Sequence, residues 1–226
     1  MDSNEIKHLI KKSWRWIWDS DSILSWIVAL IIIFIVVKFI FFPTLSFITG
    51  TSLPLAGVES SSMDHQMVED DLGRLSLCGK FYSKNDKQSI NFNEYWQICG
   101  DWYESRNITK DIFSKFTLSK GFAKGDIIIV WGRFEPKLGD IIIFKANSDS
   151  SAPRPIIHRI IKIENEIIQT KGDHNSDQLI STNNQYNTDE THIKKDQLVG
   201  KAIFKIPYLG YVKIWTTDLM NKILGR

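Results

Sequence analysis

Three polar residues that lie far apart in the chain have the side-chain types of a serine hydrolase. Ser62 lies in the segment VESSSMDH at 58–65, His158 lies within the apolar run PIIHRII, and Asp173 follows the next apolar run in TKGDHNSD. A serine hydroxyl becomes a nucleophile when a base accepts its proton, and an acid beside a histidine fixes the tautomer of that base. Each residue alone has an ordinary explanation as a turn residue or a hydrogen-bonded core histidine. Their combination indicates nucleophilic catalysis.

Short β-branched runs, bounded by glycine, aspartate, asparagine and proline, predict the strands that position these residues. No long amphipathic helical period separates the runs, which argues against a doubly wound α/β sheet. The sequence therefore predicts a mainly β, antiparallel domain. Within it we expect a hairpin that turns at Glu164-Asn165 and brings His158 opposite Asp173. The runs are IIIVWG at 127–132, IIIFKA at 141–146, IIHRIIKI at 156–163, IIQTKGD at 167–173, LVGKAIFKI at 198–206 and YVKIW at 211–215.

An apolar run near the N-terminus predicts a transmembrane anchor. ILSWIVALIIIFIVVKFIFF at 23–42 carries one charge, Lys38, and about 20 helical residues cross the hydrocarbon core of a bilayer. A cleaved signal peptide has a shorter apolar core and a small-residue cleavage site, which this run lacks. Basic residues precede the run, and no Lys or Arg follows it before Arg74. The positive-inside rule therefore predicts a single-pass protein of the cell membrane, with 1–22 cytoplasmic and 43–226 extracytoplasmic.

Residues 64–121 predict an insertion in the extracytoplasmic domain, because they are polar and interrupt the strand pattern. Cys78 and Cys99 lie in this insertion and have no CxxC partners, which excludes a zinc ribbon. We expect them to form a disulfide, which requires an oxidising compartment. Asn107-Ile108-Thr109 is a glycosylation sequon that is usable only outside the cytoplasm.

The composition of the whole chain limits the classes of function. With 43% hydrophobic and 24% charged residues, the chain is typical of a globular protein. Its net charge of +2 gives no concentrated basic face for nucleic acid, so we expect no nucleic-acid partner. We also expect no cofactor and no metal.

The order of these motifs after an anchor resembles the type I signal peptidases, and more closely their archaeal and endoplasmic-reticulum branch. The resemblance covers the anchor and most of residues 50–75 and 122–216, and it implies a signal-peptidase-like β-domain. The matching motifs are Ser60-Ser61-Ser62-Met63, GDIIIV at 125–130, GDIIIF at 139–144, His158-Arg159-Ile160, Lys171-Gly172-Asp173-His174-Asn175 and GKAIFKIPYLGYVKIW at 200–215.

The resemblance also implies a role for each matching residue. Ser62 would be the nucleophile of a serine endopeptidase, and Ser60 would supply a hydroxyl to the oxyanion hole. His158 would be the general base in place of the bacterial lysine, and Asp173 would orient it. The substrates would be signal-peptide-bearing preproteins with small side chains before the scissile bond, met at the bilayer surface. The secretion translocon would be a further partner.

The chain departs from the family pattern at two places. The nucleophile segment continues with Asp64-His65, where the family often has an acidic residue and proline, so His65 becomes a rival base. The resemblance implies a second acidic residue a few residues after Asp173, which Asp177 matches, with Asp189 as its substitute.

Two other functions stay open at this point. A metal-dependent hydrolase would use His158, Asp173 and His174 as ligands. Adjacent residues of an extended strand point to opposite faces, however, and the chain has no HExxH motif. A non-catalytic, membrane-tethered β-domain would bind an envelope partner through its aromatic insertion. Chelator sensitivity distinguishes the first function from a serine peptidase, and substitution of Ser62 by alanine distinguishes the second.

Overall fold

A computed structural model describes residues 2–69, 73–83 and 89–211 of the chain. It divides into two compact units, residues 1–48 and 49–226, each of which has its own internal contacts. The predicted strand at 211–215 lies outside the described residues except for Tyr211.

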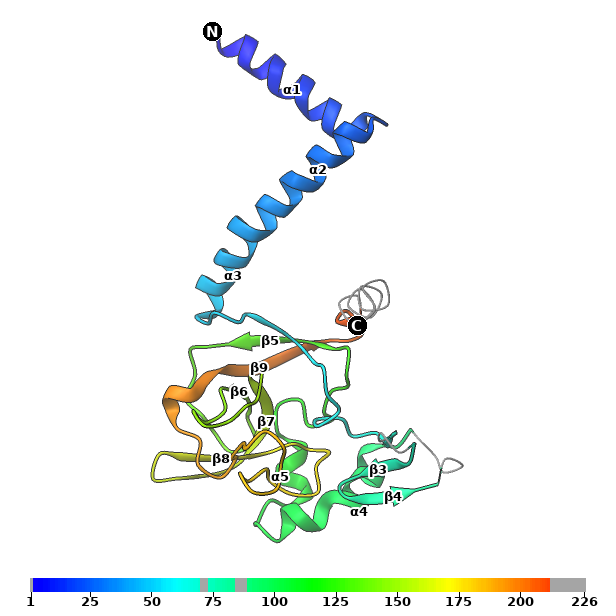
Figure 1. Ribbon diagram of the computed structural model, residues 1–226, viewed down its shortest axis with the longest axis vertical. Helices are drawn as coiled ribbons and strands as arrows, with labels where there is room; N and C mark the ends of the chain where they lie inside the picture. Colours follow the sequence, from blue (N-terminus) through cyan, green and yellow to red (C-terminus); the bar gives the residue numbers. More distant parts are fainter. Residues whose placement is uncertain (1, 70–72, 84–88, 212–226) are drawn as a thin grey trace. The chain divides into compact units, whose positions relative to one another are not determined.

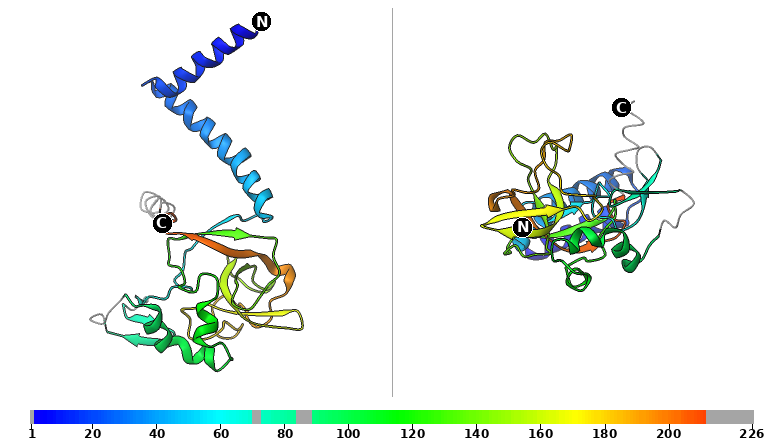
Figure 2. Two further views of the ribbon diagram at one scale, coloured as in Figure 1. Left: turned by 180° about the vertical axis from the view of Figure 1, so that it is seen from behind. Right: turned by 90° about the horizontal axis from the view of Figure 1, so that it is seen from below.

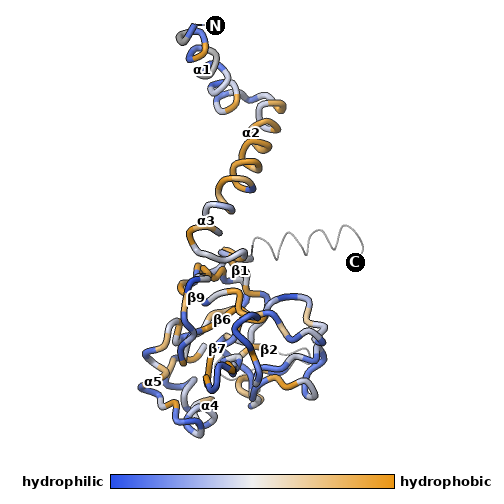
Figure 3. The backbone as a smooth tube through the Cα atoms, turned by 90° about the vertical axis from the view of Figure 1, so that its left-hand side faces the viewer, coloured by the Kyte–Doolittle hydropathy of each residue, from blue (hydrophilic) through white to orange (hydrophobic). Residues whose placement is uncertain are grey.

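The first unit consists of two helical segments. Helix α1 (Ser3–Asp19) is followed by a continuous helix made of α2 (Ile23–Val36), a π-helical turn (Val37–Phe41) and α3 (Phe42–Thr49). Of the described residues, Ile23–Thr49 is the one helix long and apolar enough to cross a membrane, and an 18-residue stretch within it has a mean hydropathy of 3.0. Its apolar character is visible along α2 in Figure 3. The sequence therefore predicted the helix correctly.

The helix does not stop where the predicted anchor ends, at Phe42. Pro43 lacks an N–H group and its ring crowds the carbonyl one turn earlier, so a proline usually kinks or ends a helix. Here the preceding turn is widened, and the Phe42 N–H donates to the carbonyl of Val37 five residues earlier. The helix then continues through Pro43 to Thr49. The position of the bilayer along this helix stays a prediction.

The second unit is built on an antiparallel sheet. Its strands are β1 (Leu55–Gly57), β5 (Ile127–Trp131), β6 (Ile141–Phe144), β7 (Ile156–Glu164), β8 (Ile167–Lys171) and β9 (Leu198–Ile206). Among the described residues, the spatial order is β1-β5-β9-β6-β7-β8, so β1 and β8 are the edges. Figure 1 labels the strands from β5 to β9. The predicted runs from 127 to 206 all form strands, because β-branched side chains pack well on a pleated surface. The prediction of a mainly β, antiparallel domain with an N-terminal apolar helix is confirmed.

The β7–β8 hairpin contains a β-bulge that the sequence did not reveal. Asn165 and Glu166 form the turn, both with positive φ, and Glu164 pairs with Ile167. From this turn, a regular hairpin would pair His158 with Asp173. Instead the register shifts between Ile160 and Lys162, so that Arg159 pairs with Lys171. The shift of one residue moves Asp173 to the other face of the sheet from His158.

The insertion folds into a small layer of its own. It contains β2 (Val68–Glu69), β3 (Leu75–Leu77), β4 (Lys80–Tyr82), α4 (Phe92–Glu104) and α5 (Lys110–Ser114). In the left view of Figure 2, the teal and green ribbon of this stretch gathers on one side of the second unit. Helix α4 begins at the capping residue Asn91, whose side chain accepts the N–H groups of Asn93 and Glu94. The expected Cys78–Cys99 disulfide is confirmed and ties the β3–β4 turn to α4. Asn107 is exposed after this helix, and its glycosylation stays a prediction.

The core of the insertion is aromatic. Tyr95, Trp96, Tyr103 and Phe113 are buried together with the disulfide, and they stack or meet edge to face. Ile161 of β7 is buried in the same cluster. The bulge therefore falls at one of the residues by which β7 contacts the insertion.

Candidate active site

The segment that contains Ser60 and Ser62 follows the edge strand β1. Val58 continues the pairing of β1 with the turn before β5, because its N–H donates to Asp126 and its carbonyl accepts from Gly125. Met63 is buried in the core of the sheet, and its carbonyl accepts the N–H of Phe122. These contacts fix the chain on both sides of the serines.

The two serine hydroxyls lie within hydrogen-bond distance of each other. Ser60 Oγ and Ser62 Oγ are 3.2 Å apart, with Ser60 exposed and Ser62 half-buried. The Ser62 carbonyl accepts the N–H of His174 at 2.9 Å, which connects this segment to the chain after β8. Hydroxyls in this arrangement suit the nucleophile and oxyanion-hole roles that the sequence suggested.

His158 lies on β7 with its ring buried against a carboxylate. Its Nδ1 is hydrogen-bonded to Glu190 Oε1, and both side chains are at most 4% exposed. Glu190 in turn accepts the hydroxyl of Thr170 at 2.9 Å and the N–H of Leu179 at 2.7 Å. A carboxylate held in this way keeps Nδ1 protonated, which leaves Nε2 free to accept a proton.

Gly172 allows the histidine and the serine segment to approach each other. A Cβ at residue 172 would lie 2.8 Å from His158 Nε2, 2.8 Å from the Ser62 carbonyl oxygen and 2.7 Å from Asn175 Nδ2. These distances are too short for any side chain. The glycine in the KGD motif is therefore required sterically between the proposed base and the nucleophile segment.

One cavity of about 790 Å³ joins these groups. Ser60, Ser62 and His158 line it together with the edge strand β1. Much of the remaining wall is apolar, with Leu53, Ala56, Phe122, Ile143 and Ile157 among its residues. Both Ser62 and His158 line this cavity, and among the described residues no hydrogen bond joins their side chains. Catalytic hydrogen bonds are often long or absent before substrate binds.

The structure corrects the expected pairing of Asp173 with His158. The Asp173 carboxylate is fully buried and accepts hydrogen bonds from Arg159 (2.6 to 3.1 Å), from His65 Nε2 (2.9 Å) and from the Tyr103 hydroxyl (3.1 Å). Burial alone would raise the pKa of Asp173. The charge of Arg159 and the hydrogen bonds from His65 and Arg159 outweigh burial and hold this pKa well below its usual range.

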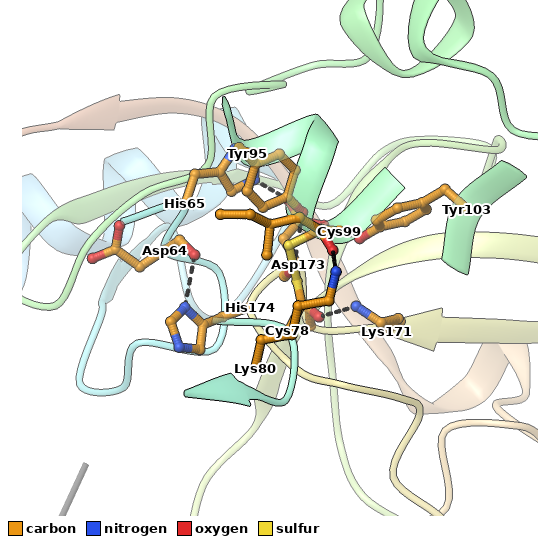
Figure 4. The surroundings of a disulfide bond; sticks show 12 residues. Asp64, His65, Cys78, Lys80, Tyr95, Cys99, Tyr103, Lys171, Asp173 and His174 are labelled. Carbon is orange, nitrogen blue, oxygen red and sulfur yellow. Dashed lines mark hydrogen bonds and ion pairs between the residues drawn. A yellow bond between two sulfur atoms is a disulfide. The ribbon is translucent and has the colours of Figure 1, made fainter. Parts of the chain in front are cut away.

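The rival base His65 belongs to this second, buried cluster. Its ring stacks on Tyr95 with 3.7 Å between the ring centroids, and Figure 4 shows both residues with Asp173 beside the disulfide. Burial lowers the pKa of His65, although the bond to Asp173 opposes this. Its Nε2 bonds to Asp173, its Nδ1 is buried without a hydrogen-bond partner, and His65 is not among the residues that line the cavity with Ser62.

The remaining candidates make their side-chain hydrogen bonds with residues other than His158. Asp177 is largely exposed and accepts the indole N–H of Trp102 at 2.9 Å, which corrects its expected place in the site. The Asp189 carboxylate accepts from Thr191. The ring of His174 donates to the Asp64 carbonyl at 3.0 Å. In the described part of the chain, no three His, Cys, Asp or Glu side chains gather in a way that would hold a metal ion.

Sequence reasoning missed Glu190, the acid that contacts His158. The segment after β8 returns to this strand, where the Glu190 carbonyl accepts the N–H of Thr170 at 3.0 Å. Nothing in the local sequence distinguishes Glu190 from its neighbour Asp189. The only available signal was that an acid had to lie on the same face of the hairpin as His158.

Comparison with known proteins identifies relatives for part of the chain, although no family model matches it. Over 109 residues it is 29% identical to the signal peptidase complex catalytic subunit SEC11 of Zygosaccharomyces rouxii, which covers 45% of this chain and 62% of the relative. The SEC11 of Lodderomyces elongisporus is 31% identical over 108 residues, which is 45% of this chain and 61% of the relative. Signal peptidase catalytic subunits are therefore homologues of this chain. The chain spans less than two thirds of the length of these relatives.

Proposed function

We propose that the chain is a membrane-anchored serine endopeptidase that removes signal peptides from exported preproteins. The observation that carries the proposal is one cavity lined by Ser60, Ser62 and His158, with Glu190 on the far nitrogen of the histidine ring. The homology to SEC11 catalytic subunits supports the choice of substrate.

In the proposed mechanism, Ser62 Oγ attacks the carbonyl carbon of the scissile peptide bond while His158 Nε2 accepts the hydroxyl proton. Glu190 stabilises the imidazolium that forms, and it does not itself take up a proton. The Ser60 hydroxyl donates to the oxyanion of the tetrahedral intermediate. His158 then returns the proton to the leaving amine, and water hydrolyses the acyl-enzyme with the same base.

The substrate is proposed to bind as an extended strand along β1. Leu55, Ala56 and Gly57 line the cavity, and β1 is an edge of the sheet, so its outer backbone groups can pair with a peptide. The apolar walls of the cavity then meet alternate side chains of that peptide. This arrangement suits the small side chains that the family resemblance implies before the scissile bond.

The proposed orientation places the N-terminus in the cytoplasm and the β-domain on the other side of the membrane. The distribution of Lys and Arg around the apolar helix supports it. The Cys78–Cys99 disulfide supports it independently, because disulfides persist in oxidising compartments. Protease added to the outside of intact cells should digest the β-domain, and digestion that requires lysis would contradict this orientation.

The test of the function is cleavage of a model preprotein by the full-length chain in detergent. Wild type should cut at the end of the signal peptide and Ser62→Ala should not. Ser60→Ala should retain partial activity, since removal of one oxyanion donor typically costs about 10²–10³ in rate. A wild-type chain that binds the preprotein but never cuts it would favour the non-catalytic β-domain.

A further inference from the structure

Helix α1 has two chemically different faces. At 3.6 residues per turn, Ile6, Trp14 and Ile17 fall on one side, and Lys11, Lys12 and Arg15 fall on the other. Trp16 and Trp18 extend the apolar side on its two flanks. The apolar side is open to solvent in this structure: Ile6, Trp14, Trp16 and Trp18 are 40 to 63% exposed.

The break between α1 and α2 is a hydrogen-bonded turn at residues 20–22. The Ser22 side chain caps α2 by accepting the N–H of Leu24. Ser25 is buried, and its hydroxyl lies 2.9 Å from the carbonyl oxygen of Ser20 and 2.7 Å from that of Ser22. The Ser22 N–H donates to Ser20 Oγ. These contacts make α1 a separate helix that ends three residues before the apolar helix begins.

That position fixes what α1 can contact. Because Ile23–Thr49 can cross a bilayer, the C-terminal end of α1 lies within a few residues of the membrane surface. Tryptophan is enriched at this interface, where an apolar ring body and a polar N–H are both satisfied. Helix α1 carries four Lys or Arg against two acidic residues, Glu5 and Asp19, which is complementary to anionic lipid.

We propose that α1 is an interfacial helix that lies in the plane of the membrane and binds anionic phospholipid headgroups. Its Ile and Trp side is buried at the boundary between headgroups and acyl chains, and its Lys and Arg side contacts the phosphates. The chain therefore has a second membrane contact besides its span, and this contact responds to the lipid charge of one leaflet. The proposal does not depend on the catalytic function.

The test places single nitroxide labels on both sides of α1 in the full-length chain. The native cysteines are joined in a disulfide, so an introduced cysteine is the one free thiol. Labels at Ile6→Cys and Ile17→Cys are compared with labels at Lys11→Cys and Arg15→Cys. The protein is reconstituted in vesicles of phosphatidylcholine, with or without phosphatidylglycerol, and collision rates with O2 and with a water-soluble nickel chelate are measured.

In phosphatidylglycerol vesicles, the labels at 6 and 17 should collide several-fold more with O2 and less with nickel than those at 11 and 15. In a Lys11→Gln/Lys12→Gln/Arg15→Gln variant, the label at 6 should collide less with O2 and more with nickel than it does without these substitutions. Each cation near an anionic surface changes the partition into the membrane about fivefold. A matched Glu5→Gln/Asp19→Asn variant should keep the label at 6 in the membrane.

Three outcomes would overturn the proposal. Equal accessibility on the two sides means that α1 does not lie at the interface. Equal results with and without phosphatidylglycerol mean that the cationic side does not select anionic lipid. Protection of the labels at 6 and 17 from both reagents means that another protein surface, such as a second copy, covers the apolar side.

Discussion

Replacing Glu190 by glutamine tests the register argument most directly. Glutamine keeps the size of the side chain and an oxygen that can accept the Leu179 N–H, now 2.7 Å from the carboxylate. It loses the negative charge beside His158 Nδ1 and brings an amide N–H₂ group in its place. Because that group is a donor, it favours the tautomer with its proton on Nε2, which cannot accept the Ser62 proton.

We expect a large fall in kcat that is confined to the chemical step. The same acid-to-amide change in a serine-protease triad lowers kcat by about 10⁴. At 1.36 kcal/mol for each factor of ten, this corresponds to about 5 kcal/mol of transition-state stabilisation. We expect Glu190→Gln to lower kcat for preprotein cleavage by about 10³–10⁴, with little change in KM and a folded protein by circular dichroism.

Asp173→Asn is the matched control, because it makes the same chemical change at the acid that the sequence favoured. It leaves Arg159 fully buried without its charged partner, and breaking a buried ion pair costs about 3–5 kcal/mol of stability. We expect a large fall in the midpoint of thermal unfolding, while the molecules that stay folded cleave at a rate near wild type. If Asp173→Asn keeps its stability and loses activity while Glu190→Gln stays active, the assignment of the two acids is wrong.

Five further substitutions test four other positions. Gly172→Ala should lower kcat for preprotein cleavage, because the new Cβ would lie 2.8 Å from His158 Nε2. The midpoint of thermal unfolding should change much less. Burial lowers the pKa of Lys171 from 10.5 to about 8. Wild-type stability should therefore rise by about 3 kcal/mol between pH 8 and 10.5 relative to Lys171→Met, measured by urea unfolding, since the unfolded chain binds the proton more tightly over this range. If the difference in unfolding free energy between wild type and Lys171→Met does not change with pH, the burial of the Lys171 ammonium group is contradicted. His65→Ala should be less stable but active, whereas His158→Ala and His158→Lys should both be inactive; an essential His65 with a dispensable His158 would reverse the assignment of the base.

The strands could be predicted because their sequences carry local signals. Gly125-Asp126 and Gly139-Asp140 each precede a β-branched run, and each run became a strand, β5 and β6. The β7–β8 turn also falls within one residue of its predicted position. Turn chemistry and β-propensity act over a few residues, which is the range that a single sequence reveals.

The bulge in β7 could not be predicted in the same way. Register is visible in a sequence when buried and exposed residues alternate, but IIHRII offers apolar residues to both faces. Ile160 is buried in the sheet, and Ile161 is buried in the aromatic core of the insertion. The insertion therefore determines the face on which each later residue of the hairpin lies. Without knowledge of its fold, the pairing of His158 with Asp173 was the simplest expectation.

The insertion also explains why the KGD motif carries an aspartate that does not contact His158, because His65 and Tyr103 of the insertion both donate to the Asp173 carboxylate. Tyr95 of α4 donates to the Asp173 carbonyl at 2.9 Å, and the Cys78 N–H donates to the His174 carbonyl at 2.9 Å. The disulfide fixes Cys78 and α4 to each other, so both contacts hold the chain immediately after Gly172. This chain in turn donates the His174 N–H to the Ser62 carbonyl. The backbone at Asp173 and His174 thus supports the nucleophile segment, and the insertion is part of the structure that positions Ser62.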